Sequence, residues 1–305
     1  MLSTTFKELD VDVTTLLDAT FQAIIDCADI VGQRSIHNGT TGTVNKTGDA
    51  VTTLDIVMDM TFIENVKACC QTIVSEEQEL PIEGMIKNGL TFVMDPLDGS
   101  SNASSGYPLG SMFAIERDGS MIVAGYVVYG TITTFTIATK NSCKTLNANE
   151  PSTIRDVIVP IDGKLLCVNE GHSNLWTDDV ARNYCDLARM NEHVFRNSGC
   201  MVADCDRVLI DGGLFAYPSN SKSPAGKLRL VYEARPMAFI FEAAGGRAVD
   251  CSGKRLLDIE ITDTHQRTSM VVGSSTNVET YLNFHWRDLL NTEYDDWLEE
   301  PDPTI

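Results

Sequence analysis

The chain has 305 residues, of which 43% are hydrophobic, and this composition is typical of a globular protein with a substantial buried core. Its 43 acidic and 23 basic residues give a formal net charge of −20. Because this charge repels both a nucleic-acid backbone and an anionic membrane surface, neither is expected as a partner.

The first half of the chain is predicted to contain helices followed by a β-meander. Apolar residues recur at three- and four-residue steps through residues 13–36, which indicates an amphipathic helix. TIVSEE (72–77) and TFVMD (91–95) are expected to be short buried strands, each ending in acidic residues. Residues 110–139 are rich in β-branched residues around an Asp118-Gly119 turn, which predicts antiparallel strands.

After residue 150 the pattern changes to strands that alternate with helices, for example LLCVNEG (165–171) followed by WTDDVARNYCDLARM (176–190). We therefore expect an α/β fold with two lobes, residues 1–158 and residues 159–305. The nine cysteines lack the spacing of a zinc site, and neither a signal peptide nor an 18-residue apolar stretch is apparent. A cytoplasmic location is expected from this pattern.

Carboxylates gather where the predicted strands end. Glu76 and Glu77 follow one strand, and Asp95 and Asp98 follow another in the sequence MDPLDGSSN. A single exposed acid is usually a solvated surface charge, but several acids at strand ends would repel one another unless a cation lay among them. Oxygen ligands of this kind suit Mg²⁺ or Mn²⁺. The intervening proline restricts the backbone, so both aspartates and the Leu97 carbonyl group can turn toward one ion.

Directly after these acids, Gly99, Ser100 and Ser101 offer backbone N–H groups with little side-chain bulk around them. Such a turn can bind a phosphate group. The sequence therefore predicts a metal ion and a phosphate group held side by side.

Several motifs carry a family resemblance. In order and spacing, the chain is similar to the fructose-1,6-bisphosphatase and sedoheptulose-1,7-bisphosphatase family in the segments TGDAVTTLD, VSEE, MDPLDGSSN, VNEG, GCMVADCDRVL, LFAYPSNSKSPAGKLRLVYE and AGGRAVD. The resemblance extends from about residue 13 to about residue 285. Relatives of inositol monophosphatase share the DPxDGSSN core, but KLRLVYE favours the sugar bisphosphatases. The resemblance implies a layered α-β-α-β-α sandwich that assembles into homodimers or homotetramers.

The resemblance also implies a role for each matching residue. Two or three Mg²⁺ ions, with Mn²⁺ as an alternative, would be held by Glu76, Glu77, Asp95, Leu97, Asp98 and Glu233. Catalysis would involve Asp49, Asp55 and Glu77, of which Asp55 and Glu77 would take a proton from the attacking water. None of the seven acids departs from the family pattern. The implied reaction is a metal-assisted in-line displacement of the 1-phosphate of a sugar bisphosphate.

The residues implied to bind the substrate form two groups. The 1-phosphate would contact Asp98, Gly99, Ser100 and Ser101. The C-terminal lobe would bind the sugar and its distal phosphate through Asn169, His172, Arg196, Asn197, Met201, Tyr217, Lys227 and Arg229. By the same resemblance, Arg196 would reach into the site of a neighbouring subunit.

Two positions depart from the family pattern. His172 and Asn197 stand where fructose-1,6-bisphosphatases typically have tyrosines at the distal phosphate. The loss of two large rings would widen the pocket, which favours the seven-carbon substrate sedoheptulose 1,7-bisphosphate and a connection with the pentose phosphate pathway. The alternatives are a gluconeogenic fructose-1,6-bisphosphatase in which these changes are neutral, an inositol-phosphate hydrolase, and a non-catalytic sugar-phosphate binding module.

Overall fold

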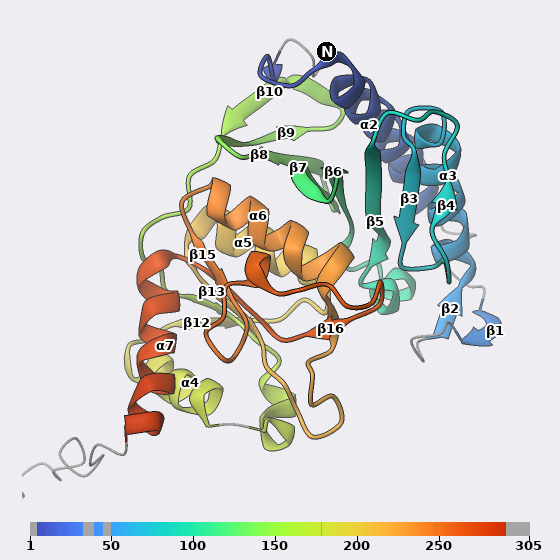
Figure 1. Cartoon of the computed structure of the whole chain (residues 1–305). Coiled ribbons are helices and arrows are strands. Elements are labelled where there is room, and N and C mark those ends of the chain that lie inside the picture. Colours follow the sequence, from blue (N-terminus) through green and yellow to red (C-terminus); the bar gives the residue numbers. More distant parts are fainter. Residues whose placement is uncertain (1–4, 33–39, 45–49, 178, 291–305) are drawn as a thin grey trace, which may run out of the picture.

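The computed structural model describes residues 5–32, 40–44, 50–177 and 179–290. Figure 1 shows two β-sheets with helices between them and on both outer sides. One outer layer contains α2 (Val11–Val31) and α3 (Thr53–Val66), and the other contains α4 (Val180–Met190) and α7 (Ser275–Leu290). The middle layer contains α5 (Met201–Asp211) and α6 (Arg235–Ala243), which contact both sheets. This order confirms the layered sandwich that the family resemblance implied.

The larger sheet has eight strands in the order β10-β9-β8-β7-β6-β5-β3-β4. Its strands are β3 (Thr72–Ser75), β4 (Ile82–Glu83), β5 (Leu90–Asp98), β6 (Leu109–Arg117), β7 (Ser120–Tyr129), β8 (Thr133–Thr139), β9 (Ser142–Asn147) and β10 (Glu150–Asp156). The predicted meander is confirmed, and its first turn has positive φ angles at Asp118 (50°) and Gly119 (78°). Strands β3 and β5 are parallel, so their carboxyl ends lie at the same edge of the sheet.

The smaller sheet has five strands in the order β12-β11-β13-β17-β15. They are β11 (Leu165–Cys167), β12 (Val194–Arg196), β13 (Gly213–Tyr217), β15 (Arg247–Val249) and β17 (Met270–Gly273). Two short ribbons complete the strands, β1 (Thr40–Val44) with β2 (Ala50–Thr52) and β14 (Leu228–Arg229) with β16 (Arg267–Thr268). The 3₁₀ helices are η1 (Ser100–Ser105), η2 (Glu170–Leu175) and η4 (Leu256–Asp258), and η3 (Leu230–Ala234) is a π-helix.

The layers enclose three hydrophobic cores. One lies between α2, α3 and the larger sheet and includes Phe62 and Phe92, whose ring centroids are 6.5 Å apart. The second surrounds α5 and α6 between the sheets, and the third packs α4 and α7 on the smaller sheet. Residues of α5 and α6 thus pack into one core that is shared by the two sheets.

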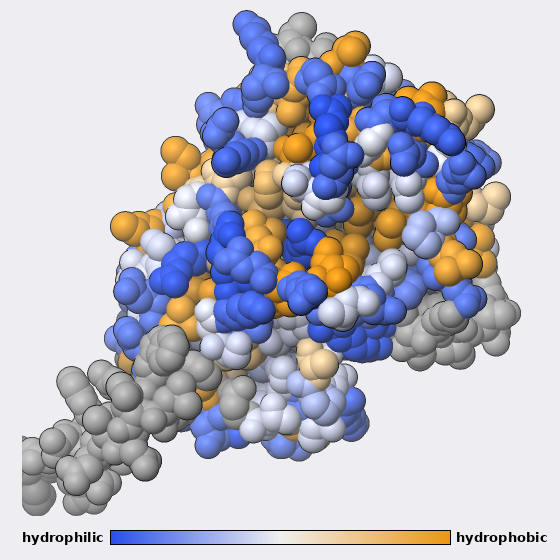
Figure 2. Space-filling model, in the orientation of Figure 1, coloured by the Kyte–Doolittle hydropathy of each residue, from blue (hydrophilic) through white to orange (hydrophobic). Residues whose placement is uncertain are grey.

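The surface in Figure 2 is mostly hydrophilic, and hydrophobic residues form only small patches on the face shown. Among the described residues, no helix has both the length and the apolar character needed to span a membrane. No disulfide bond joins the nine cysteines, all of which lie in the described part of the chain.

Candidate active site

A cavity of about 570 Å³ lies where the carboxyl ends of β3 and β5 in the larger sheet approach those of β11 and β13 in the smaller sheet. Most of the residues predicted for the site line this cavity, namely Asp55, Glu76, Glu77, Asp95, Leu97, Asp98, Gly99, Ser100, Ser101, Asn169, His172, Asn197, Met201, Tyr217, Lys227, Arg229 and Glu233. The structure therefore brings together residues that are up to 178 positions apart in the sequence, from Asp55 to Glu233. Asp49, a predicted catalytic acid, lies outside the described residues.

The parallel pairing of β3 and β5 places two of the acids side by side. Ser75 pairs with Met94, so Glu76 and Asp95 are the next residues along the two neighbouring strands. The Glu76 amide N–H donates to the Met94 carbonyl oxygen at 3.1 Å. This arrangement agrees with the expectation that acids at the ends of neighbouring strands gather at one edge.

The strand that we predicted to end at Asp95 continues to Asp98, the last residue of the MDPLD motif, and it contains an irregularity within this motif. Asp95 pairs with Met112 and Asp98 pairs with Gly110, so three steps along β5 match only two along β6. In a regular strand, residues three positions apart point to opposite faces of the sheet. The extra residue makes a β-bulge, which returns Asp98 to the face occupied by Asp95, and both then line the cavity.

Burial and mutual repulsion raise the pKa values of the acids in the cavity. Asp95 is 2% exposed, and its pKa lies well above its usual range because of burial and the charges of Glu76, Glu233 and Asp98. The pKa of Glu233 is raised well above its usual range by burial and by Glu76, although the Arg229 backbone N–H donates to its Oε2 at 2.5 Å. Carboxylates that raise one another's pKa in this way are stabilised by a bound cation.

The donor set of this end of the cavity fits Mg²⁺ or Mn²⁺. The acids Glu76, Glu77, Asp95, Asp98 and Glu233 line the cavity here, together with Leu97, whose carbonyl group the family resemblance implies as a further ligand. In the described part of the chain, no three His, Cys, Asp or Glu side chains are close enough to hold a metal ion by themselves. Such spacing is compatible with Mg²⁺, which usually keeps several water ligands and binds one or two carboxylates together with phosphate oxygens.

Asp98 is held in place by the start of α5. Its Oδ2 accepts hydrogen bonds from the Val202 backbone N–H at 2.7 Å and from the Cys200 thiol at 3.0 Å. Burial raises the pKa of Asp98, and these two hydrogen bonds oppose that rise. A residue of the N-terminal half is thus oriented by the C-terminal half.

The phosphate loop after Asp98 requires glycine at its first position. Gly99 has a φ of 79°, and a Cβ atom there would lie 2.8 Å from the Cβ atom of Cys200. Ser100 then begins η1, and within this helix the Asn102 side-chain amide donates to the carbonyl oxygens of Ser198 at 2.9 Å and Pro108 at 3.0 Å. The loop is therefore packed directly against the segment before α5.

Asp55 is positioned by a reciprocal cap at the start of α3. The Thr52 backbone N–H donates to Oδ2 of Asp55 at 2.6 Å, and the Asp55 backbone N–H donates to the Thr52 hydroxyl at 3.2 Å. Burial raises the pKa of Asp55, which is 4% exposed.

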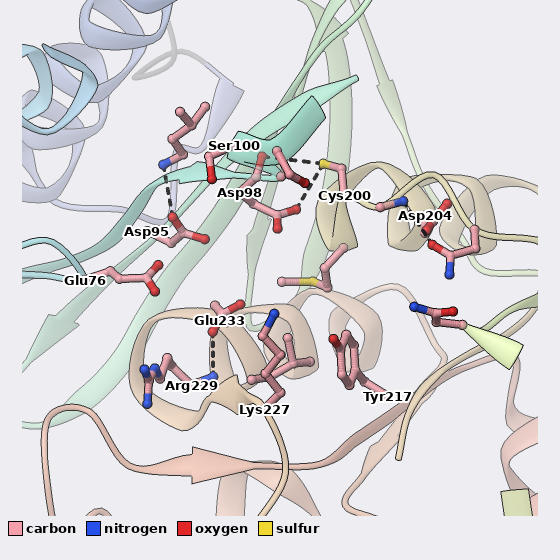
Figure 3. Close-up of a pocket in the computed structure, with 18 of the residues that line it drawn as sticks. Glu76, Asp95, Asp98, Ser100, Cys200, Asp204, Tyr217, Lys227, Arg229 and Glu233 are labelled. Atoms are coloured by element: carbon pink, nitrogen blue, oxygen red, sulfur yellow. Dashed lines mark hydrogen bonds between the residues drawn. The ribbon is translucent and has the colours of Figure 1, made fainter. Parts of the chain in front are cut away.

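The C-terminal half contributes polar and basic residues to the cavity. Asn169 and His172 follow β11, Asn197 follows β12, and Tyr217 is the last residue of β13. Figure 3 shows Lys227, Tyr217 and Arg229 on the other side of the cavity from Asp98 and Ser100.

Arg196 departs from the other predicted residues because it does not line the cavity of its own chain. It is exposed at the end of β12, and its Nη1 donates to the carbonyl oxygen of Phe195 at 2.8 Å. Its predicted reach into a neighbouring subunit stays a prediction.

Sequence reasoning missed several residues that line the cavity, including Thr52, Gly199, Cys200 and Asp204. Both carboxylate oxygens of Asp204 accept from the Ser198 backbone N–H, at 2.9 and 3.1 Å, and so support the loop before α5. Within the segment GCMVADCDRVL the sequence predicts a role only for Met201. An acid in the first turn of a predicted helix was the available signal.

Comparison with known proteins agrees with this geometry. Residues 3–151 match the sequence model "Fructose-1-6-bisphosphatase, N-terminal domain", and residues 159–286 match "Fructose-1-6-bisphosphatase, C-terminal domain". The chain is 37% identical over 272 residues to fructose-1,6-bisphosphatase of Schizosaccharomyces pombe, covering 81% of this chain and 78% of that protein. It is 34% identical over 305 residues to fructose-1,6-bisphosphatase 1 of Bos taurus, covering 90% of each.

A solved structure is also similar. The crystal structure of Leishmania major fructose-1,6-bisphosphatase in holo form superimposes with a TM-score of 0.86 at 30% identity, over 93% of this chain and 97% of that one. Enzymes of this family are metal-dependent phosphatases, which agrees with the oxygen donors in the cavity. Since both halves of the chain match the family and relatives above 30% identity span most of it, this chain belongs to the fructose-1,6-bisphosphatase family and is a phosphatase.

Proposed function

We propose that the protein hydrolyses the 1-phosphate of fructose 1,6-bisphosphate. The observation that carries this proposal is one cavity that is lined both by clustered carboxylates with a phosphate loop and by a second set of polar and cationic residues, Lys227, Tyr217 and Asn169. A substrate with two phosphate groups matches this division, because one phosphate needs metal ions among the acids and the other needs hydroxyl and cationic donors. The names of the relatives support the six-carbon sugar over the seven-carbon sugar.

Each end of the cavity has a distinct task in this proposal. Mg²⁺ or Mn²⁺ bound by the acids would neutralise phosphate charge and lower the pKa of bound water. Asp55 takes the one proton that the attacking water loses, assisted by Glu77, and burial raises the pKa of Asp55, which makes its carboxylate a stronger base. The backbone N–H groups after Gly99 hold the 1-phosphate, while Lys227 attracts the distal phosphate.

Sedoheptulose 1,7-bisphosphate is the second candidate substrate, and with it a connection to the pentose phosphate pathway. His172 and Asn197 both line the cavity and are exposed, at the positions where the family resemblance implied tyrosines. The His172 Nδ1 atom lies 3.4 Å from the Asn169 side-chain nitrogen, so the side chains of His172 and Asn169 are neighbours. Wider space at this end would admit one more carbon atom, but a difference of that size discriminates by only about 1–3 kcal/mol.

The test is phosphate release from the two sugar bisphosphates and from inositol 1-phosphate, each with Mg²⁺. Higher kcat/KM on fructose 1,6-bisphosphate supports the first candidate, and higher kcat/KM on the seven-carbon sugar supports the second. Asp98→Asn should lower kcat/KM roughly 10²-fold, because a carboxylate at the reacting phosphate is lost. Release from the inositol ester alone would identify an inositol-phosphate hydrolase, and release from none would leave a binding module.

The assembly is proposed to be a homodimer or homotetramer in which Arg196 completes the site of a neighbouring subunit. Sedimentation of the purified protein measures its mass. A fully active monomer, or full activity of Arg196→Ala in the assembled protein, would contradict this part of the proposal.

A further inference from the structure

Asp59 is a buried carboxyl group for which the proposed reaction has no role. It lies in α3, one helical turn after Asp55, is 2% exposed, and is not among the residues that line the cavity. Because residues four positions apart share a helix face, Asp59 projects from α3 on the same side as Asp55. On that side the Asp59 carboxylate reaches Ser75, the last residue of β3, which Glu76 and Glu77 follow.

The two oxygens of Asp59 hold both ends of the Glu76-Glu77 segment. Oδ1 accepts from the Ser75 hydroxyl at 2.6 Å, and Oδ2 accepts from the Gln78 side-chain amide at 2.5 Å. Ser75 and Gln78 are the residues that directly precede and follow the two glutamates. The same Ser75 oxygen accepts from the Glu77 backbone N–H at 3.3 Å, so the contact continues into the segment itself.

We propose that Asp59 is a positioning residue that fixes the Glu76-Glu77 segment to α3. It thereby sets the separation between Asp55, which α3 carries, and Glu77, which the segment carries. This inference rests on the proposed phosphatase activity, in which these two carboxylates act on the same water. A displacement of about 1 Å in such a pair lowers activity roughly 10²-fold.

The chemistry of the contact distinguishes two substitutions. Asp59→Asn keeps one oxygen to accept from Ser75, and its amide N–H₂ can donate to the side-chain oxygen of Gln78 after the Gln78 amide turns over. Asp59→Leu keeps the branching and the number of heavy atoms of the side chain but removes both acceptors. Asp59→Asn should therefore retain the activity and metal binding that Asp59→Leu loses.

Asp206 supplies a matched control. Its carboxylate accepts from the Tyr126 hydroxyl at 2.8 Å, it lies in α5, and it does not line the cavity. Asp206→Leu therefore removes a part-buried hydrogen bond of a carboxylate that does not line the cavity. Its effect on the unfolding midpoint shows how much stability is lost when a hydrogen bond outside the cavity is removed.

The experiment measures kcat and KM on fructose 1,6-bisphosphate, Mn²⁺ binding by calorimetry without substrate, and the midpoint of thermal unfolding. Asp59→Leu should lower kcat about 10- to 100-fold and weaken Mn²⁺ binding by a similar factor, with KM for the sugar within about 3-fold of the unsubstituted protein. Asp59→Asn should stay within about 3-fold in both measurements. Asp206→Leu should lower only the unfolding midpoint. If Asp59→Leu does not fold, Ser75→Ala removes one of the two contacts and should show the same losses in smaller measure.

Three outcomes would overturn the inference: unchanged kcat and Mn²⁺ binding in Asp59→Leu, equal losses in the two leucine variants, or a loss in Asp59→Asn as large as in Asp59→Leu. Failure of the proposed function is recognised separately, because the unsubstituted protein would then release no phosphate. In that case the Mn²⁺ affinities alone decide whether Asp59 positions the acidic segment.

Discussion

Gly99 offers a direct test of how the phosphate loop is built. Two features oppose a side chain at this position: a φ of 79°, and a Cβ position only 2.8 Å from the Cβ atom of Cys200. Gly106, which ends the same 3₁₀ helix, has a similar φ of 68° but no atom within 4 Å of its Cβ position. Alanine at the two positions therefore separates backbone strain from crowding.

The expected magnitudes follow from these contacts. Gly106→Ala should cost about 1–2 kcal/mol of unfolding free energy, which is the usual penalty for the left-handed conformation. Gly99→Ala should add about 1–3 kcal/mol, because the crowded neighbour is backbone and a short buried side chain that cannot move aside. It should also lower kcat/KM roughly 10²-fold by displacing the phosphate loop, whereas Gly106→Ala should change kcat/KM only slightly.

Guanidinium unfolding followed by circular dichroism, together with the phosphate-release assay, measures both effects. In the background of Gly99→Ala, Cys200→Gly removes the atoms nearest the new methyl group and should recover most of the crowding cost but none of the backbone cost. Equal destabilisation by the two alanine variants would refute the role assigned to Cys200.

Two further predictions concern contacts made by the N-terminal half. The hydrogen bond from Arg117 lowers the pKa of Asp10 from 3.8 to about 2, so this pair stabilises the fold above about pH 4 and the benefit disappears as pH falls toward 2. Asp10→Asn removes the charge but can still cap α2. The unfolding midpoint of this variant should therefore be lower than that of the unsubstituted protein above about pH 4, and the difference should disappear as the pH falls to about 2. A difference that does not depend on pH would contradict this assignment. Asn102→Ala loses its donors to Ser198 and Pro108 and should lower kcat/KM about 10-fold, while an unchanged value would mean that the loop is held without them.

The sequence predicted which residues line the cavity better than it predicted how the fold brings them together. Acids at the ends of apolar segments were sufficient to locate Glu76, Asp95 and Asp98, because side-chain chemistry and strand periodicity are local properties. The bulge that turns Asp98 into the cavity was not predicted, since it appears only when β5 is aligned with β6.

Long-range contacts set the limit of such prediction. Nothing local to Gly99 indicates that Cys200 will occupy the space beside it, and the hydrogen bonds of Asp59 depend on how α3 docks on β3. The lobe boundary near residue 158 and the role of Asp49 stay predictions. Preference between a six-carbon and a seven-carbon sugar depends on a pocket dimension that residue identity does not give.

The shared middle layer has a consequence for how the chain is synthesised. The inner face of the eight-stranded sheet is covered by α5 and α6, whose last residue is Ala243, although the sheet itself is complete at Asp156. When the sheet has left the ribosome, roughly 90 further residues must follow before its partner helices emerge, which takes on the order of 5–20 s at typical elongation rates. During that interval the nascent chain presents an apolar face that only later-made sequence can bury. The N-terminal half thus forms the core under α2 and α3 from its own residues, but the core on the inner face of its sheet needs helices of the C-terminal half.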